Sequence, residues 1–210
     1  MPNPHTHPRS ANLLTEEQRE QLVQMAARRR WGRSLMLVGW LHLLAFSLCY
    51  YLTQNNHHDS LSYLAIWVGE LLGVWVIFRV SGGPRPADPA PQPLECFVQR
   101  VWIAYFVLAF NLCSLNTLRG HFLFEFFPAM ASLASFAFIV MSVTLSRRFF
   151  AAVLVMFASG LLMAAFLLHA FLIFAVAWWL VLNVTGLELE RRGRRNEVAP
   201  EMAEAGSETA

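Results

Sequence analysis

The chain has 210 residues, of which 56% are hydrophobic, 13% are aromatic and only 14% are charged. A soluble domain carries about 25% charged residues, and here the charge gathers at the two ends and in short connectors between long apolar blocks. The net charge of +2 is too small to indicate nucleic acid as a partner. Composition therefore excludes an ordinary soluble domain and predicts an all-α, polytopic membrane protein whose main contact is the lipid bilayer.

Residues 1–34 precede the first apolar block and are predicted to be a cytoplasmic segment. Thr15 followed by Gln18 is a capping-box pattern, which predicts an amphipathic juxtamembrane helix that runs to the arginines at 28–30. This helix is expected to lie on the inner membrane surface or to continue into the first span. The first apolar block is expected to act as its own membrane anchor.

Six spans are predicted in a bundle, because a helix needs about 20 mainly apolar residues to cross a bilayer. The stretch 149–186 is too long for one crossing, since a single helix would reach roughly 57 Å against a hydrocarbon core of about 30 Å. We therefore divide it by a tight turn near His169. The predicted spans are about 35–53, 61–80, 97–115, 122–145, 149–167 and 170–186.

The arginines are distributed asymmetrically over these spans. With the N-terminus inside, the arginines at 28–33, 79–100, 147–148 and 191–195 fall on the inner side, and only Arg119 falls outside. Cytoplasmic flanks are enriched in arginine and lysine, so both termini are predicted to be cytoplasmic in a bacterial-type inner (plasma) membrane. Five spans would place the last arginine cluster outside.

Two polar segments complete the predicted organisation. Residues 81–93 are rich in proline and glycine and are expected to form a cytoplasmic linker. Residues 187–210 become polar and acidic and are expected to form a disordered cytoplasmic tail.

An intramembrane polar pair is predicted from His42 in the first span and Glu70 in the second. Counted from the inner ends, His42 lies roughly 10 Å and Glu70 roughly 14 Å into the membrane, so the two can meet. Gly39 and Gly73 share faces with them and would allow close approach of the two helices. The pair is either a hydrogen bond that fixes helix register or a proton-accepting or ligand-binding site.

Histidines also gather in the predicted outer loops. His57 and His58 fall in the first loop, His121 in the second and His169 in the third, with carboxylates nearby. Imidazole and carboxylate groups bind metals and haem, but none of these spacings is a ligand motif. The two interpretations are a metal site and solvated loop residues. The sequence indicates no particular cofactor.

The function classes follow from what the chain lacks. It contains no H-E-x-x-H, P-loop or G-x-G-x-x-G motif, and residues 157–160 lack the first glycine of the G-x-S-G of rhomboid proteases. The sequence therefore favours a non-enzymatic accessory or scaffold component with a membrane-protein partner. Two alternatives stay open: a small solute or ion carrier or channel that uses His42 and Glu70, expected as a homo-oligomer, and a metal- or haem-binding redox protein that uses the outer-face histidines.

Overall fold

The computed structural model describes seven parts of the chain, which are residues 21, 24–26, 29–55, 59–81, 93–118, 126–144 and 149–207. Within these parts, all regular secondary structure is helical. Five of the described helices are long and apolar enough to cross a membrane, and a sixth apolar helix is shorter.

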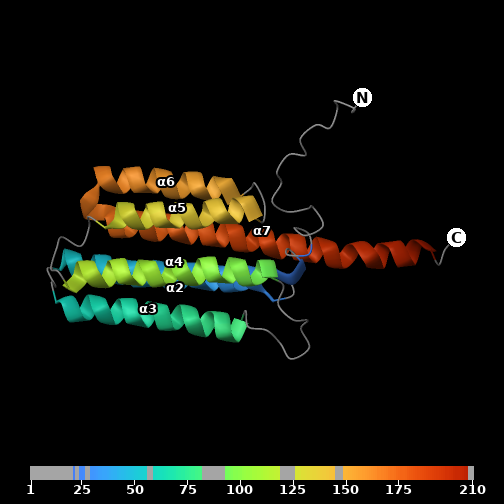
Figure 1. The fold of residues 1–210 in the computed structure, drawn as a ribbon, viewed down its shortest axis with the longest axis horizontal. Helices are drawn as coiled ribbons and strands as arrows, with labels where there is room; N and C mark the ends of the chain where they lie inside the picture. Colours follow the sequence, from blue (N-terminus) through green and yellow to red (C-terminus); the bar gives the residue numbers. More distant parts are fainter. Residues whose placement is uncertain are drawn as a thin grey trace, which may run out of the picture.

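The helices run alternately up and down, side by side (Figure 1). A short 3-10 helix, η2 (Leu167–His169), separates the last two. The long helices are α2 (Trp31–Gln54), α3 (Ser60–Ser81), α4 (Pro93–Leu118), α5 (Phe127–Thr144), α6 (Phe150–Ala165) and α7 (Ala170–Ser207).

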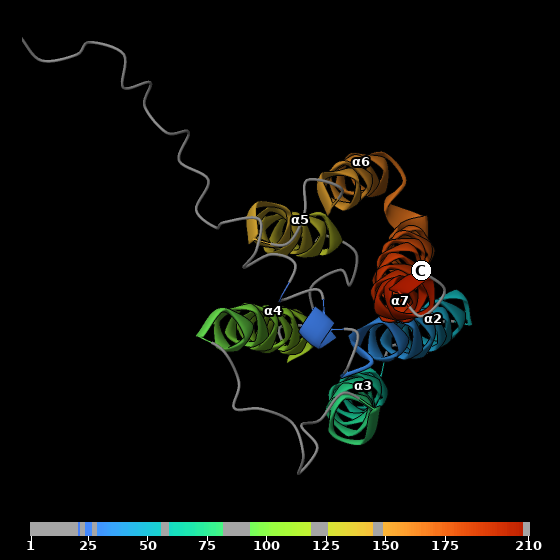
Figure 2. The ribbon, with the colours of Figure 1, turned by 90° about the vertical axis from the view of Figure 1, so that its right-hand side faces the viewer.

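Seen along the helix axes, the six helices form a closed ring (Figure 2). Each helix contacts the next in chain order, and α7 closes the ring against α2. The contact between α2 and α7 is the most extensive in the bundle, and it joins the first and last helices of the ring. The up-and-down order follows from short connectors, whereas this closing contact depends on the whole ring.

Glycines make the close α2–α7 contact possible. A Cβ atom added at Gly32 of α2 would lie 2.5 Å from the Gly186 carbonyl oxygen, and one added at Gly186 would lie 2.5 Å from the Gly32 carbonyl oxygen. Further along α2, a Cβ atom at Gly39 would lie 2.8 Å from Nδ2 of Asn183. Backbones approach this closely only where side chains are absent, which is how helices associate where lipid supplies no hydrophobic drive between them.

Small residues also join α5 to α6. Gly160 of α6 faces Ala131 of α5, and an added Cβ atom would lie 3.3 Å from the alanine Cβ. Pro128 is the second residue of α5, where the missing N–H has no helical partner to lose. The proline therefore begins this helix and does not bend it.

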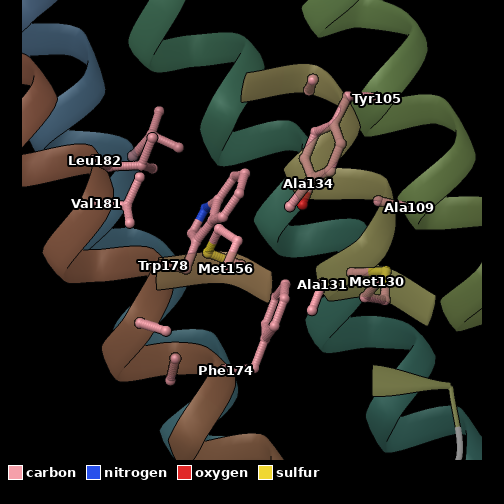
Figure 3. Packing of buried hydrophobic residues seen from close by; sticks show 14 of the residues in the cluster. Tyr105, Ala109, Met130, Ala131, Ala134, Met156, Phe174, Trp178, Val181 and Leu182 are labelled. Carbon is pink, nitrogen blue, oxygen red and sulfur yellow. The ribbon is translucent and has the colours of Figure 1, made fainter. Parts of the chain in front are cut away.

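The interior of the ring is filled mainly by aromatic side chains. Phe174 and Trp178 project from α7 toward Tyr105 of α4 and the alanines of α5 (Figure 3). The Trp178 ring stacks on Tyr105 with centroids 5.1 Å apart, and it meets Phe138 of α5 at 5.7 Å. Rings of this size fill space between helices that are too far apart for aliphatic contacts.

Large apolar side chains cover the outside of the bundle. Leu44 is 68% exposed, Trp75 is 63% exposed and Leu161 is 62% exposed. A soluble protein rarely exposes contiguous apolar surface of this extent, whereas lipid solvates it. The exposed surface and the helix lengths thus suit a membrane.

Several helix ends differ from the expected span ends. α2 begins at Trp31, four residues before the predicted start, and α4 extends beyond its apolar block at both ends. Apolar length marks only the part that lipid surrounds, whereas helical hydrogen bonding continues into polar flanks. α5 begins at Phe127, and the residues 122–125 of the predicted span lie outside the described part of the chain.

The largest correction concerns the C-terminal segment. The expected disordered tail began at residue 187, but α7 continues as helix to Ser207. The Arg192 Nε donates to Glu188 Oε1 at 2.9 Å, an i,i+4 pair that supports the helix beyond the apolar part. Glutamate and arginine favour helix formation and also keep a segment soluble. Low hydrophobicity alone therefore does not distinguish a polar helix from a disordered tail.

The N-terminal helix and the proline-rich linker are described only at their edges. Residues 24–26 are helical, and Ala26 is buried against the bundle. Arg30 has a φ of 53°, a left-handed conformation that ends this turn before α2 begins at Trp31. The rest of the predicted amphipathic helix and residues 82–92 of the linker lie outside the described residues.

Candidate intramembrane polar site

His42 and Glu70 lie at the middle of neighbouring antiparallel helices. His42 is the twelfth residue of α2, which has 24 residues, and Glu70 is the eleventh of α3, which has 22. Nδ1 of His42 is hydrogen-bonded to Oε1 of Glu70. The imidazole is 6% exposed and the carboxylate side chain 13% exposed, so both are removed from the surface. The structure therefore brings together the two residues of the predicted pair.

The second ring nitrogen of His42 defines the charge of the pair. Nε2 is buried and has no hydrogen-bond partner among the residues that the structure describes. A proton on Nε2 would create a buried donor without an acceptor, so we assign the proton to Nδ1, which donates to the ionised Glu70. In this state the pair carries one proton and a net charge of −1.

Aromatic rings hold the imidazole in place. The Phe46 ring lies one turn along α2 with its centroid 4.0 Å from that of His42. From α7, Phe174 lies at 5.4 Å and Trp178 at 5.6 Å. These contacts restrict the ring rotamer, so Nδ1 is positioned toward α3 before any ligand or proton arrives.

A crevice with a volume of about 40 Å³ lies beside the pair. Nine of its twelve lining residues come from α3 and α4, so it lies along the seam between these two helices. A site of about 10–15 Å³ holds one water molecule, so the crevice has room for about three. Among the described residues that line the crevice, Glu70 is the only carboxylate, and none is an arginine.

The α4 side of the crevice was not anticipated from the sequence. Tyr105, Ala109 and Cys113 recur every four residues, are all buried, and form one face of α4 toward Glu70. This spacing is readable in the sequence, but within an apolar span it does not stand out from any other stripe.

Side-chain hydrogen bonds attach α3 to the bundle. Tyr63, Trp67 and Val74 are the buried residues of this helix. The Tyr63 hydroxyl is hydrogen-bonded to Oγ1 of Thr53 at 2.9 Å, and the Trp67 indole N–H donates to Oγ1 of Thr117 at 3.4 Å. Together with the His42–Glu70 bond, these links fix the register of α3 where apolar packing is limited.

The predicted roles of the two glycines differ in outcome. Gly73 of α3 does face α2, since an added Cβ atom would lie 2.6 Å from a Leu41 methyl carbon. The prediction for Gly39 was wrong, because this residue faces Asn183 of α7. In a ring, residues on one side of a helix can contact either of its two neighbouring helices. Spacing along a single helix does not predict which neighbour a given residue contacts.

The outer histidines do not form a site within the described residues. His169 is exposed in η2, and its ring lies 6.2 Å from that of Tyr50. The described parts of the chain contain no group of three or more potential metal ligands. His57, His58 and His121 lie outside the described residues.

Fold and site together describe a helical protein whose apolar helices suit a membrane and whose described interior holds a His–Glu pair. No protein-family model matches the chain, and neither a curated protein nor a solved structure shows significant similarity to it.

Proposed function

We propose that this chain is a six-span membrane protein of the small carrier or channel class, and that His42 and Glu70 form its proton-binding site. The observation that carries the proposal is the hydrogen bond between these side chains at the middle of two apolar helices, beside a crevice large enough for water. Ionisable groups at such depth are costly, and they usually mark ion or proton pathways.

The pair is suited to exchange one proton. With a single proton it carries a net charge of −1 in surroundings of low dielectric constant, where a charge without a partner is costly. The second proton neutralises the pair but leaves a donor on Nε2, or on the carboxyl group, that lacks an acceptor. The two costs oppose each other, so small changes around the pair shift the proton in or out.

Six spans and a cytoplasmic position of both termini are part of the proposal. Arg33 near the start of α2, Arg79 near the end of α3 and Arg100 in the first third of α4 lie on the side of the bundle toward which α7 runs (Figure 1). Arg192 lies on α7 beyond its apolar part, on the same side. Basic residues favour the cytoplasmic side, which assigns that end to the cytoplasm. α6 has 16 residues and spans about 24 Å, so the bilayer would thin locally around it. Since six spans are few for a pathway, the proposal includes a homo-oligomer.

Proton movement into proteoliposomes tests the proposal. Purified protein is reconstituted with a trapped pH-sensitive dye, and a potassium gradient with valinomycin drives protons inward. Wild type should acidify the lumen faster than empty liposomes, and Glu70→Gln should abolish the difference because an amide keeps the hydrogen bond but takes no proton. Glu188→Gln, which removes a carboxylate from the polar part of α7, should leave the rate unchanged.

A non-enzymatic accessory role predicts a different result. Wild-type protein that is folded, but whose liposomes acidify no faster than empty ones, would overturn the proton pathway. Equal acidification rates for wild type and Glu70→Gln would show that any proton pathway does not use the His42–Glu70 pair. Either outcome would return the accessory role, with a membrane-protein partner, to first place.

A further inference from the structure

With the His42 proton assigned to Nδ1, the ionised Glu70 leaves a negative charge in the crevice, and none of the described residues in its wall is an arginine or a lysine. The groups around it that can titrate are His42 and Cys49 on α2 and Tyr105 and Cys113 on α4. From α5 and α7, the side chains that pack here are Met130, Phe174 and Trp178, which are apolar or aromatic. Charge in so apolar a place is neutralised either by a proton or by a cation.

The walls of the crevice suit a particular kind of cation. Trp67 of α3 and Tyr105, Phe106 and Phe110 of α4 contribute aromatic rings to the wall that also holds Glu70. Ring faces attract ammonium groups, and the attraction grows when water is excluded. Side-chain oxygen atoms come from only Glu70 and Tyr105 in this wall, whereas alkali-metal cations need a shell of several oxygens.

The volume limits the size of the cation. A crevice of about 40 Å³ holds about three water molecules. Ammonium has the size of one water and methylammonium of two, so both fit with their charge near the carboxylate. A quaternary ammonium is bulkier and has no N–H group to donate to the Glu70 carboxylate.

We propose that this crevice binds ammonium or methylammonium, held by the Glu70 carboxylate and the rings of Trp67, Tyr105, Phe106 and Phe110, in exchange for the second proton of the His42–Glu70 pair. The inference rests on the proposed proton site, which supplies the negative charge. The exchange balances: one ammonium cation enters, one proton leaves, and the pair with its occupant stays neutral.

Binding of radiolabelled methylammonium to the full-length protein in detergent tests the inference. Wild type should bind it saturably, and binding should weaken as pH falls, by up to tenfold per unit where protons compete fully. Excess ammonium should displace the label, whereas sodium and tetraethylammonium at the same ionic strength should not. Glu70→Gln should abolish binding, and Glu188→Gln should not change it.

The aromatic wall is tested separately. Phe110→Leu removes one ring from a partly buried position and should weaken binding about two- to thirtyfold. Tyr105→Phe keeps the ring and should bind almost as well as wild type. Thermal unfolding in detergent shows whether each variant is folded. If Phe110→Leu does not fold, Phe110→Tyr, which keeps an aromatic ring at this position, is tested in its place.

The outcomes separate this inference from the proton site. Proton movement that depends on Glu70, without saturable methylammonium binding, would overturn the cation site and keep the proton site. Sodium that displaces the label as well as ammonium does, or Phe110→Leu that binds like wild type, would also overturn it. If folded wild-type protein neither moves protons nor binds methylammonium, both proposals would be overturned.

Discussion

Nδ1 of His42 on α2 is hydrogen-bonded to the Glu70 carboxylate on α3, while Nε2 of the same ring is buried without a partner among the described residues. This bond therefore satisfies one of the two ring nitrogens of His42. It also joins two helices that otherwise meet through apolar side chains and the Thr53–Tyr63 hydrogen bond. The stability of this interface and the protonation of the pair depend on the same two atoms.

Removing both partners of the His42–Glu70 bond should cost less than the two single losses added together. Glu70→Leu leaves the buried His42 Nδ1 unsatisfied, so we expect the free energy of unfolding to fall by about 1–3 kcal/mol. In the double variant with His42→Leu, the loss should be smaller than the sum of the single losses. Glu70→Gln should lie near wild type because its amide can still bond to the ring. Reversible unfolding in mixed detergent micelles compares wild type with the four variants: Glu70→Leu, His42→Leu, the double variant and Glu70→Gln.

A coupling energy near zero would show that the bond contributes no stability in the membrane protein, whatever its role in proton binding. His169→Leu is the matched control for the histidine, because this residue is exposed in η2. It should unfold like wild type.

Glycine packing between α2 and α7 gives a second prediction. Gly32→Ala places a Cβ atom 2.5 Å from the backbone oxygen of Gly186, which can move only with its helix. The two helices must separate, and we expect a loss of about 1–3 kcal/mol in the free energy of unfolding. Thermal unfolding in detergent, followed by circular dichroism, measures the change.

Gly69→Ala is the control for this substitution. An added Cβ atom at Gly69 meets no atom within 4 Å, and alanine favours the helix more than glycine does. The variant should be as stable as wild type or slightly more stable. A loss at Gly69 equal to the loss at Gly32 would mean that glycine acts through helix propensity or lipid contact and not through the α2–α7 contact.

The pair was predicted from helices that are neighbours in the sequence, and in the structure its two side chains meet. α2 and α3 are joined by a short connector, so a similar depth of His42 and Glu70 was enough to bring them together. Depth in the membrane and a short connector could not predict that Gly39 faces α7. Its partner Asn183 lies 144 residues later, and its identity depends on how all six helices close the ring.

Helix ends show the same division. The break between α6 and α7 follows from length, because one helix of residues 149–186 would be too long for a bilayer. In the structure, Phe166 leaves helical geometry with a φ of −125°, and η2 follows it. By contrast, the end of α7 depends on charged residues whose pairing is visible only once the helix exists, as for Glu188 and Arg192.

Acid should weaken the start of α3. Asp59 lies outside the span and accepts hydrogen bonds from the Ser62 hydroxyl at 2.9 Å and the Leu61 N–H at 3.2 Å. The Ser62 bond, and then the Leu61 bond, lower the pKa of Asp59 below its ordinary value of 3.8. The stabilisation is therefore present above pH 3.8 and is lost as the pH falls through the lowered pKa.

Asp59→Ala removes this contribution and tests its sign. The variant should be slightly less stable than wild type at pH 6, and the difference should shrink as the pH falls below 3.8. Thermal unfolding of both proteins between pH 3 and pH 6, in a nonionic detergent, measures it. A difference that is constant over this range would mean that the charged carboxylate does not cap α3.

The number of spans can be counted by the labelling of single cysteines in intact cells. The native Cys49, Cys96 and Cys113 are first replaced by alanine. A membrane-impermeant maleimide should label cysteine at Asn55, after α2, and at His169, between α6 and α7, because both sites lie at the end of the bundle opposite the arginines (Figure 1). Cysteine at Arg33 or Arg192 should react only after the membrane is permeabilised.

The Arg192→Cys variant decides between five and six crossings. α6 is about 24 Å long and would fall short of a hydrocarbon core of about 30 Å. If α6 does not cross, α7 begins on the inner side, runs in the direction opposite to α5, and ends outside. Labelling of Arg192→Cys in intact cells, with Arg33→Cys protected, would therefore contradict the six-span arrangement. Protection of both sites, with labelling at His169→Cys, requires that α6 cross the bilayer and that the lipid adapt to its length.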